Sequence, residues 1–148
     1  MDDAKALIGK LDLAPHPEGG WYKETWRPPD LTGGRAIATA ILFLLEHGQR
    51  SHWHRVDASE IWLWHAGSPL TLSTARGSEG PVQTQLLGGN PLVGESPQHI
   101  VAAGDWQATE AHAGWGLVSC IVAPGFQFEG FTLAPPGWSP GVESQVKR

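Results

Sequence analysis

Short runs of strand-forming residues recur along this chain, and segment 21–27 alternates with a period of two, as a β-strand does. In this segment, Tyr22, Glu24 and Trp26 fall on one face. Gly, Pro, Asn and Asp separate these runs at short intervals, as turns do. We therefore predict an all-β fold, a sandwich, jelly roll or barrel, whose further strands cover 51–55, 60–66, 70–75, 82–87, 98–101, 106–108, 116–122 and 126–133.

Three segments depart from this pattern. Residues 2–12 carry an apolar stripe at helical spacing and predict a short N-terminal helix. Segment 36–45 is an apolar run that fits a helix or a strand by length, and the neighbouring strands favour a strand buried on both faces. The tail 135–148 has little apolar content and should be irregular. We expect one domain over 1–148, with its core at about 7–134.

Composition narrows the classes of partner. The chain has 148 residues, a net charge of −5 and a sequence pI near 5.7, so it lacks the basic surface that nucleic acid or an anionic membrane would require. No apolar stretch reaches the roughly 18 residues of a membrane span. The lone Cys120 lies in an apolar run, which favours a buried thiol over a nucleophile. A single cysteine cannot form a disulfide within the chain, which favours a cytoplasmic location.

The densest cluster of reactive side chains is His52, His54 and Glu60 within segment 48–67. Residues two apart on a strand point the same way, and a turn after the strand returns Glu60 beside the two imidazoles. Two His and a carboxylate are the ligands of a facial triad, which binds Fe, Mn, Ni or Zn and leaves positions open for substrate. The alternative is a solvent-facing strand on which Glu60 pairs with a neighbouring arginine.

Several nearby side chains admit two interpretations. Trp62 and Trp64 share a face with Glu60 and could form the wall of a ligand pocket, although core packing is at least as common for tryptophan. Glu24, between two aromatic residues, is a candidate general base if burial raises its pKa, and otherwise a salt-bridge partner.

The loop that contains His16 and Glu18 also admits two interpretations. Both side chains are of types that act in catalysis or ligand binding, but the sequence Pro-Glu-Gly-Gly is typical of a tight turn. We favour the structural interpretation of this loop.

These motifs resemble those of a known superfamily. The His-x-His and Glu60 spacing resembles the first motif of the cupins, and segment 102–107 resembles the second, P-x-G-x-x-H, with Ala for Pro and Gln107 for His. More closely, the chain resembles the uncharacterised cupin-5 family, which is related in fold to dTDP-4-dehydrorhamnose 3,5-epimerases. The resemblance rests on 11–27, 51–72, 101–108 and 117–133.

The resemblance implies an antiparallel double-stranded β-helix, the cupin jelly-roll barrel, which is commonly a homodimer with a pocket at its mouth. It implies that Gln107 joins His52, His54 and Glu60 as a fourth metal ligand, and an amide oxygen is a poorer ligand than imidazole. We therefore predict a metal site formed by His52, His54, Glu60 and Gln107. The predicted substrate-binding residues are Tyr22, Trp62, Trp64 and Gln107. The predicted catalytic residues are Glu24 and Glu60.

Two functions remain open at this point. The first is a metal-dependent isomerase or epimerase acting on a carbohydrate-like substrate, or an oxygenase if the metal is Fe. The second is a cupin that binds a nucleotide or sugar derivative without metal and without catalysis, which Gln107 in place of His favours. A purely structural role is weaker, because such a barrel has no need to gather two His and a Glu.

Overall fold

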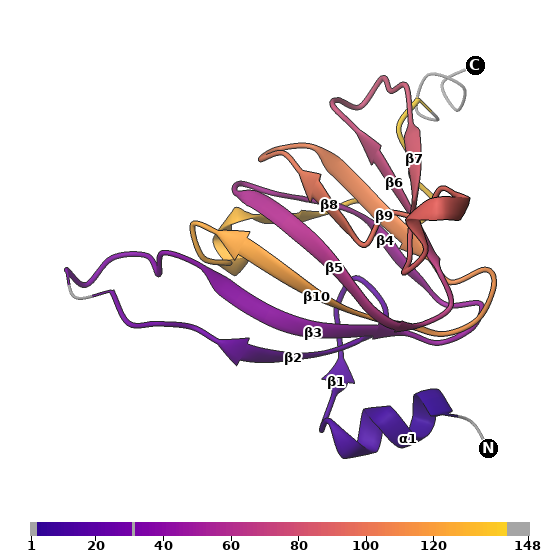
Figure 1. Cartoon of the computed structure of the whole chain (residues 1–148). Helices are drawn as coiled ribbons and strands as arrows, with labels where there is room; N and C mark the ends of the chain where they lie inside the picture. The colour runs from indigo at the N-terminus through magenta and orange to yellow at the C-terminus, as the bar shows by residue number, and fades with distance from the viewer. Residues whose placement is uncertain (1–2, 31, 142–148) are drawn as a thin grey trace.

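The structure is a computed structural model that describes residues 3–30 and 32–141. Two antiparallel sheets face each other, with strand orders β1-β2-β3-β10-β5-β8 and β11-β4-β9-β6-β7 (Figure 1). The predicted all-β jelly roll with a short N-terminal helix is confirmed. Its elements are α1 (Asp3–Lys10), β1 (Ala14–Pro15), β2 (Trp21–Trp26), β3 (Thr39–Leu45), β4 (Arg50–Val56), β5 (Ser59–Gly67), β6 (Leu70–Ala75), β7 (Gln83–Leu87), β8 (Gln98–Val101), β9 (Trp106–Glu110), β10 (Gly116–Ala123) and β11 (Phe131–Leu133), with 3-10 turns at Pro91–Val93 and Phe128–Gly130.

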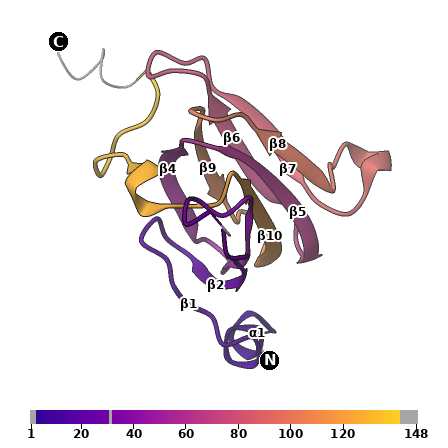
Figure 2. The ribbon, with the colours of Figure 1, turned by 90° about the vertical axis from the view of Figure 1, so that its left-hand side faces the viewer.

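The main core lies between the two sheets and follows the period-two alternation. Phe43, Trp62 and Val118 are buried there together with the Cys120 thiol. Strand β3 is buried on both faces because Leu44 points away from this core and packs against α1. Helix α1 lies outside the barrel, beside β1 and β2 (Figure 2).

Strand β4 contains a β-bulge that changes which side chains face the core. Ser51 pairs with Thr109 and His54 pairs with Gln107, so β4 advances three residues where β9 advances two. An extra residue in one strand shifts the following side chains to the opposite face. Ser51 and His54 are therefore both buried, whereas His52 faces a different environment. The expectation that His52 and His54 share a face is wrong for this reason.

The predicted strand over 126–133 is shorter than expected. Only Phe131–Leu133 forms a strand, and a 3-10 turn precedes it. The amide of Phe126 donates to the Thr39 hydroxyl, and the amide of Asp57 donates to the Gly130 carbonyl, so backbone groups of this segment bond outside a strand ladder.

Two further expectations from the sequence concern the C-terminal tail and membrane-spanning segments. Residues 135–141 contain no helix or strand, and the remainder of the predicted irregular tail lies outside the described residues. In the part of the chain that the structure describes, no helix has the length and apolar character needed to span a membrane.

Candidate functional site

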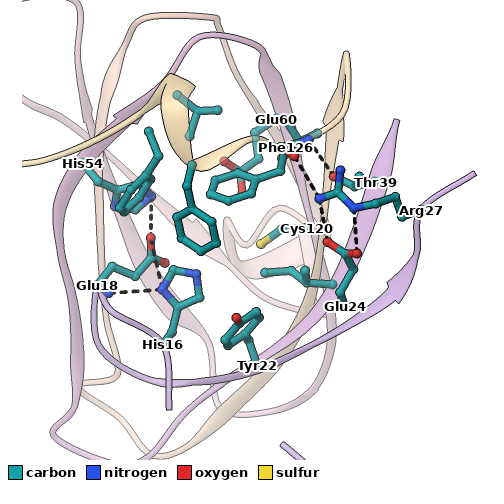
Figure 3. A pocket seen from close by; sticks show the side chains of 15 residues that line it. His16, Glu18, Tyr22, Glu24, Arg27, Thr39, His54, Glu60, Cys120 and Phe126 are labelled. Atoms are coloured by element: carbon teal, nitrogen blue, oxygen red, sulfur yellow. Dashed lines mark hydrogen bonds and ion pairs between the residues drawn. The ribbon is translucent and has the colours of Figure 1, made fainter. Parts of the chain in front are cut away.

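A cavity of about 240 Å³ opens between the two sheets (Figure 3). Because ligand pockets for drug-sized molecules usually measure about 300–1,000 Å³, this cavity suits a smaller organic molecule. Its walls combine acidic, basic and aromatic side chains from both sheets and from three loops, namely His16, Glu18, Tyr22, Glu24, Arg27, Thr39, Ile41, His54, Val56, Glu60, Cys120, Val122, Phe126, Phe128 and Phe131.

The loop between β1 and β2 directs His16 and Glu18 into the pocket. The Gly19 amide donates to the His16 carbonyl at 3.0 Å, and the His52 amide donates to the Glu18 carbonyl at 2.6 Å. Gly19 has φ +106°, and a Cβ there would collide with the Arg50 carbonyl. The loop is a tight turn, as predicted, but the same turn also presents both side chains to the cavity.

Glu18 and His54 form a buried ion pair. His54 Nε2 lies 3.0 Å from Glu18 Oε2, and His54 Nδ1 lies 2.8 Å from the His52 carbonyl oxygen. Both ring nitrogens face acceptors, so both carry hydrogen and the ring is an imidazolium. Burial alone would lower the pKa of His54, but the charge and hydrogen bond of Glu18 outweigh it and raise this pKa to about 9. Burial opposes ionisation of Glu18 as well, yet His54 holds the pKa of Glu18 below its usual value.

Glu60 is the second buried carboxyl group of the pocket, with 6% of its surface exposed. Gln107 Nε2 donates to Glu60 Oε1 at 3.0 Å, and Trp62 Nε1 donates to Gln107 Oε1 at 2.8 Å. The Trp62 bond fixes the orientation of the Gln107 amide, so that its NH₂ group faces Glu60. Burial raises the pKa of Glu60 to about 7, against the lowering effect of His54.

His16 is a neutral imidazole. The Glu18 amide donates to His16 Nδ1 at 3.1 Å, so Nδ1 is an acceptor and Nε2 carries the hydrogen. Burial lowers the pKa of His16. The ring packs edge-on against Tyr22, with a centroid separation of 4.5 Å, and lies at the cavity beside it (Figure 3). His16 thus offers a hydrogen-bond donor without a positive charge.

Glu24 lies in the pocket lining but is engaged by Arg27. The guanidinium donates from Nε and one terminal nitrogen to the two carboxylate oxygens at 2.8 and 2.9 Å. A further bond from Arg27 to the Phe126 carbonyl ties the pair to the aromatic side of the pocket. The salt bridge, the alternative that the sequence left open for Glu24, is the arrangement found.

The predicted tryptophan wall is wrong. Trp62 belongs to the core, and the Trp64 indole packs against that core and donates to the Ser68 carbonyl. Tyr22 does line the cavity, and the rest of the aromatic wall is formed by Phe126, Phe128 and Phe131. The sequence contained a signal for this wall, because three of the four phenylalanines of the chain fall within these six positions.

The predicted metal ligands do not converge. The His52 side chain lines a separate surface cleft, where its Nε2 lies 2.8 Å from the Pro135 carbonyl oxygen. Both nitrogens of His54 are occupied as donors, and Gln107 turns its NH₂ group, not its oxygen, towards Glu60. Within residues 3–30 and 32–141, no group of three or more His, Cys, Asp or Glu side chains is placed to hold a metal ion. This donor set does not fit a divalent metal.

Fold and site together thus define a class of protein: a jelly roll with a small cavity between its sheets, lined by both polar and aromatic side chains. The family model described as Cupin superfamily (DUF985) matches residues 5–134, and the chain belongs to this family. A search of curated proteins finds none that matches the chain.

Solved structures agree with this assignment. A protein of Shewanella oneidensis is 35% identical, with a TM-score of 0.85, and the match covers 99% of this chain and 90% of that one. A hypothetical protein from Leishmania major is 31% identical, with a TM-score of 0.82, and the match covers 98% and 93% of the two chains. Oxalate decarboxylase from Bacillus subtilis is 13% identical, with a TM-score of 0.63, over 83% of this chain and 30% of that one, which is a likeness of fold alone.

Proposed function

We propose that this cupin is a metal-independent isomerase or epimerase that moves a proton on a small carbonyl compound. The observation that carries the proposal is the buried Glu60, which faces the same small cavity as a neutral histidine donor and a buried ion pair. Glu60 is the base that removes a proton from the carbon beside the carbonyl group. Such enzymes need a base whose pKa lies near the working pH, and burial raises the pKa of Glu60 to about 7.

The proton transfer balances on residues of the pocket. The C–H bond breaks, its proton passes to a Glu60 oxygen, and its electron pair forms a C=C bond as the carbonyl becomes an enolate. The His16 Nε2–H and the Tyr22 hydroxyl line the cavity and supply hydrogen bonds to the enolate oxygen. In isomerisation of a hydroxycarbonyl compound, Glu60 returns the proton to the former carbonyl carbon, the hydroxyl group on the neighbouring carbon gives its proton to the enolate oxygen, and the carbonyl re-forms at that neighbouring carbon. In epimerisation, water protonates the opposite face of the same carbon, Glu60 gives its proton to the hydroxide that remains, and the original carbonyl re-forms.

Glu18 and His54 have a supporting role in this scheme. Their charges cancel at 3.0 Å, so the pair adds polarity to the cavity wall without a net charge. Gln107 positions Glu60, because its amide bonds both the carboxylate and the Trp62 indole.

The metal-dependent form of the prediction has less support. Bacillus subtilis oxalate decarboxylase has Mn(II) centres, but that protein is similar to this chain at 13% identity only. The arrangement of His52, His54 and Gln107 described above does not favour a similar centre here.

Hydrogen–deuterium exchange tests the proposal. The protein, stripped of metal with a chelator, is incubated in D₂O with a panel of small hydroxyaldehydes, hydroxyketones and aminoketones, and proton NMR follows the C–H beside each carbonyl. We expect exchange on at least one compound, reduced about 10²-fold or more in Glu60→Gln. Glu129→Gln, which changes an exposed glutamate on the Phe126–Phe131 side of the pocket, is the matched control and should keep full exchange. Exchange that persists in Glu60→Gln, or no exchange on any compound, would contradict the proposal.

We also propose that the protein forms a homodimer through the outer face of the larger sheet. One register row across that face is almost wholly apolar, and it consists of Ile100, Ile61, Ile121, Ala40 and Trp26. Ile100 is 61% exposed and Trp26 is 47% exposed, and such contiguous apolar surface is typical of an interface. Light scattering should give a dimer mass for the wild type and a monomer mass for Ile61→Lys, whereas Leu92→Lys at the β7–β8 loop should stay dimeric. A monomeric wild type would overturn this proposal.

A further inference from the structure

The charges that face the cavity do not balance. Three carboxyl groups line it, from Glu18, Glu24 and Glu60, against two cations, His54 and Arg27, so that the lining carries one excess negative charge whenever Glu60 is ionised. Glu18 is paired with His54 at 3.0 Å, and Glu24 is paired with Arg27 at 2.8 Å. Among the lining residues, this leaves Glu60 without a cation of its own. An ionised carboxylate in a buried site is costly unless a counter-charge reaches it.

The remaining walls are suited to a cation rather than an anion. Tyr22, Phe126, Phe128 and Phe131 line the same cavity, and the faces of aromatic rings attract ammonium groups. His16, which could have served as a cation, is held neutral because its Nδ1 accepts a hydrogen bond from the Glu18 amide. A phosphate or carboxylate in this cavity would meet Glu60 and find no unpaired cation to compensate for its lost hydration.

His16 shows where the neutral part of the ligand is bound. Its side chain is 7% exposed, and its Nε2–H is directed into the cavity with the Tyr22 hydroxyl nearby (Figure 3). These two donors fit a carbonyl or hydroxyl oxygen. The cavity therefore offers donors for an oxygen on one side and a lone carboxylate within an aromatic wall on the other.

We infer that the ligand of this pocket is a small α-ammonium carbonyl compound, such as an aminoketone or an amino sugar, whose ammonium group pairs with Glu60. The inference rests on the proposed function and names its substrate class. The C–H that Glu60 attacks then lies between a carbonyl group and an ammonium group, and both withdraw electrons from it. One oxygen of Glu60 contacts the ammonium group while the other takes the proton. Nucleotides and sugar phosphates are excluded as ligands by their charge.

Three probes of equal ring size test the charge selectivity on the unmodified protein: benzylamine, which is a cation at pH 7, the neutral benzyl alcohol, and the anion benzoate. Isothermal titration calorimetry should show benzylamine binding at least tenfold tighter than benzyl alcohol, with no binding of benzoate. Tetramethylammonium chloride should displace benzylamine, and sodium acetate at equal ionic strength should not. Equal affinity for amine and alcohol, or tighter binding of benzoate, would overturn the inference.

Two variants locate the selectivity. Glu60→Gln keeps the shape of the side chain and should bring benzylamine and benzyl alcohol to within about twofold of each other. Glu129→Gln removes the same charge from an exposed position and should keep the tenfold preference. A preference that survives Glu60→Gln would assign the selectivity to another group and overturn the inference.

The two proposals fail separately. A strong preference for benzylamine without proton exchange on any carbonyl compound would overturn the proposed reaction and leave the ligand class standing. Exchange on neutral hydroxyketones without any preference for an ammonium group would overturn the ligand class and leave the reaction standing.

Discussion

The two histidines of strand β4 lie two positions apart and have opposite environments. His54 is buried in the pocket and paired with Glu18, whereas the His52 side chain lies in an outer cleft against the C-terminal segment. The backbone of His52 nevertheless builds the pocket, because its amide bonds the Glu18 carbonyl and its carbonyl accepts from His54 Nδ1. Because of the β-bulge, the backbone of His52 supports the pocket while the side chain of His54 points into it.

The largest difference between the two histidines should appear on removal of each side chain. His54→Ala leaves the buried Glu18 carboxylate unpaired, which should cost about 3–5 kcal/mol of unfolding free energy. His52→Ala removes one hydrogen bond to the Pro135 carbonyl, and we expect a loss of about 1 kcal/mol. Urea unfolding at pH 7 measures both values. Equal losses would mean that the burial of the Glu18–His54 pair has no energetic consequence.

The pH dependence of stability should follow His54. The folded-state pKa of His54 is about 9 against an ordinary value of 6.5, so protonation stabilises the folded state. This contribution is complete below pH 6.5 and is lost as the pH rises through 9. A shift of this size corresponds to roughly 3 kcal/mol, measured as the fall in unfolding free energy between pH 6.5 and 9.5.

Variants separate this effect from other titrations. His54→Gln should flatten the pH dependence over this range, while His52→Gln should keep it. A wild-type unfolding free energy that does not change between pH 6.5 and 9.5 would show that His54 is not held as an imidazolium.

The turn that holds Glu18 against the bulge should be sensitive to substitution. Gly19→Ala places a Cβ against the Arg50 carbonyl at a positive φ, which should cost about 1–3 kcal/mol. Gly48→Ala is the matched control, because φ there is +85° and no atom lies within 4 Å of the added Cβ. Its cost should be about 1 kcal/mol. Thermal unfolding compares the two, and a Gly48 variant as unstable as the Gly19 variant would argue against close contact between turn and strand.

Metal removal should have the smallest effect. His52 lies outside the pocket and both His54 nitrogens are donors, so neither is placed to bind a metal. Only a metal bound to the folded state would raise the melting temperature, and we therefore expect a chelator to change the melting temperature of tag-free protein by about 1 °C or less. Elemental analysis of the same sample is the direct check. Stoichiometric transition metal that disappears in His54→Ala would restore the metal-dependent hypothesis.

Local patterns in the sequence account for most of the fold. Short runs bounded by turn residues located most of the strands, the neighbouring strands identified 36–45 as a strand buried on both faces, and helical spacing located α1. Period-two alternation placed Tyr22 and Glu24 on a single face, and both line the pocket. The reasoning failed at His52, because alternation assumes that each residue of a strand lies opposite one residue of the neighbouring strand. Strand β4 has one residue more than β9 between Ser51 and His54, and no feature of the sequence indicates this insertion.

Two further features could not be derived locally. His16 and Glu18 stand in turn residues, and a turn pattern does not specify which cavity its side chains enter. The aromatic wall was assigned to Trp62 and Trp64 because they alternate with Glu60, yet Trp62 faces a closed part of the core where Gln107 satisfies its indole.

The sequence by itself determined most of the strands and the family, since these depend on residue type and spacing. Only the tertiary structure decided which groups meet. The Glu18–His54 pair joins a loop to the opposite sheet, and the Gln107–Glu60 bond joins the two sheets. Charge pairing, tautomers and pKa values depend on such through-space distances of a few ångströms, and neither hydrophobic periodicity nor motif spacing encodes them.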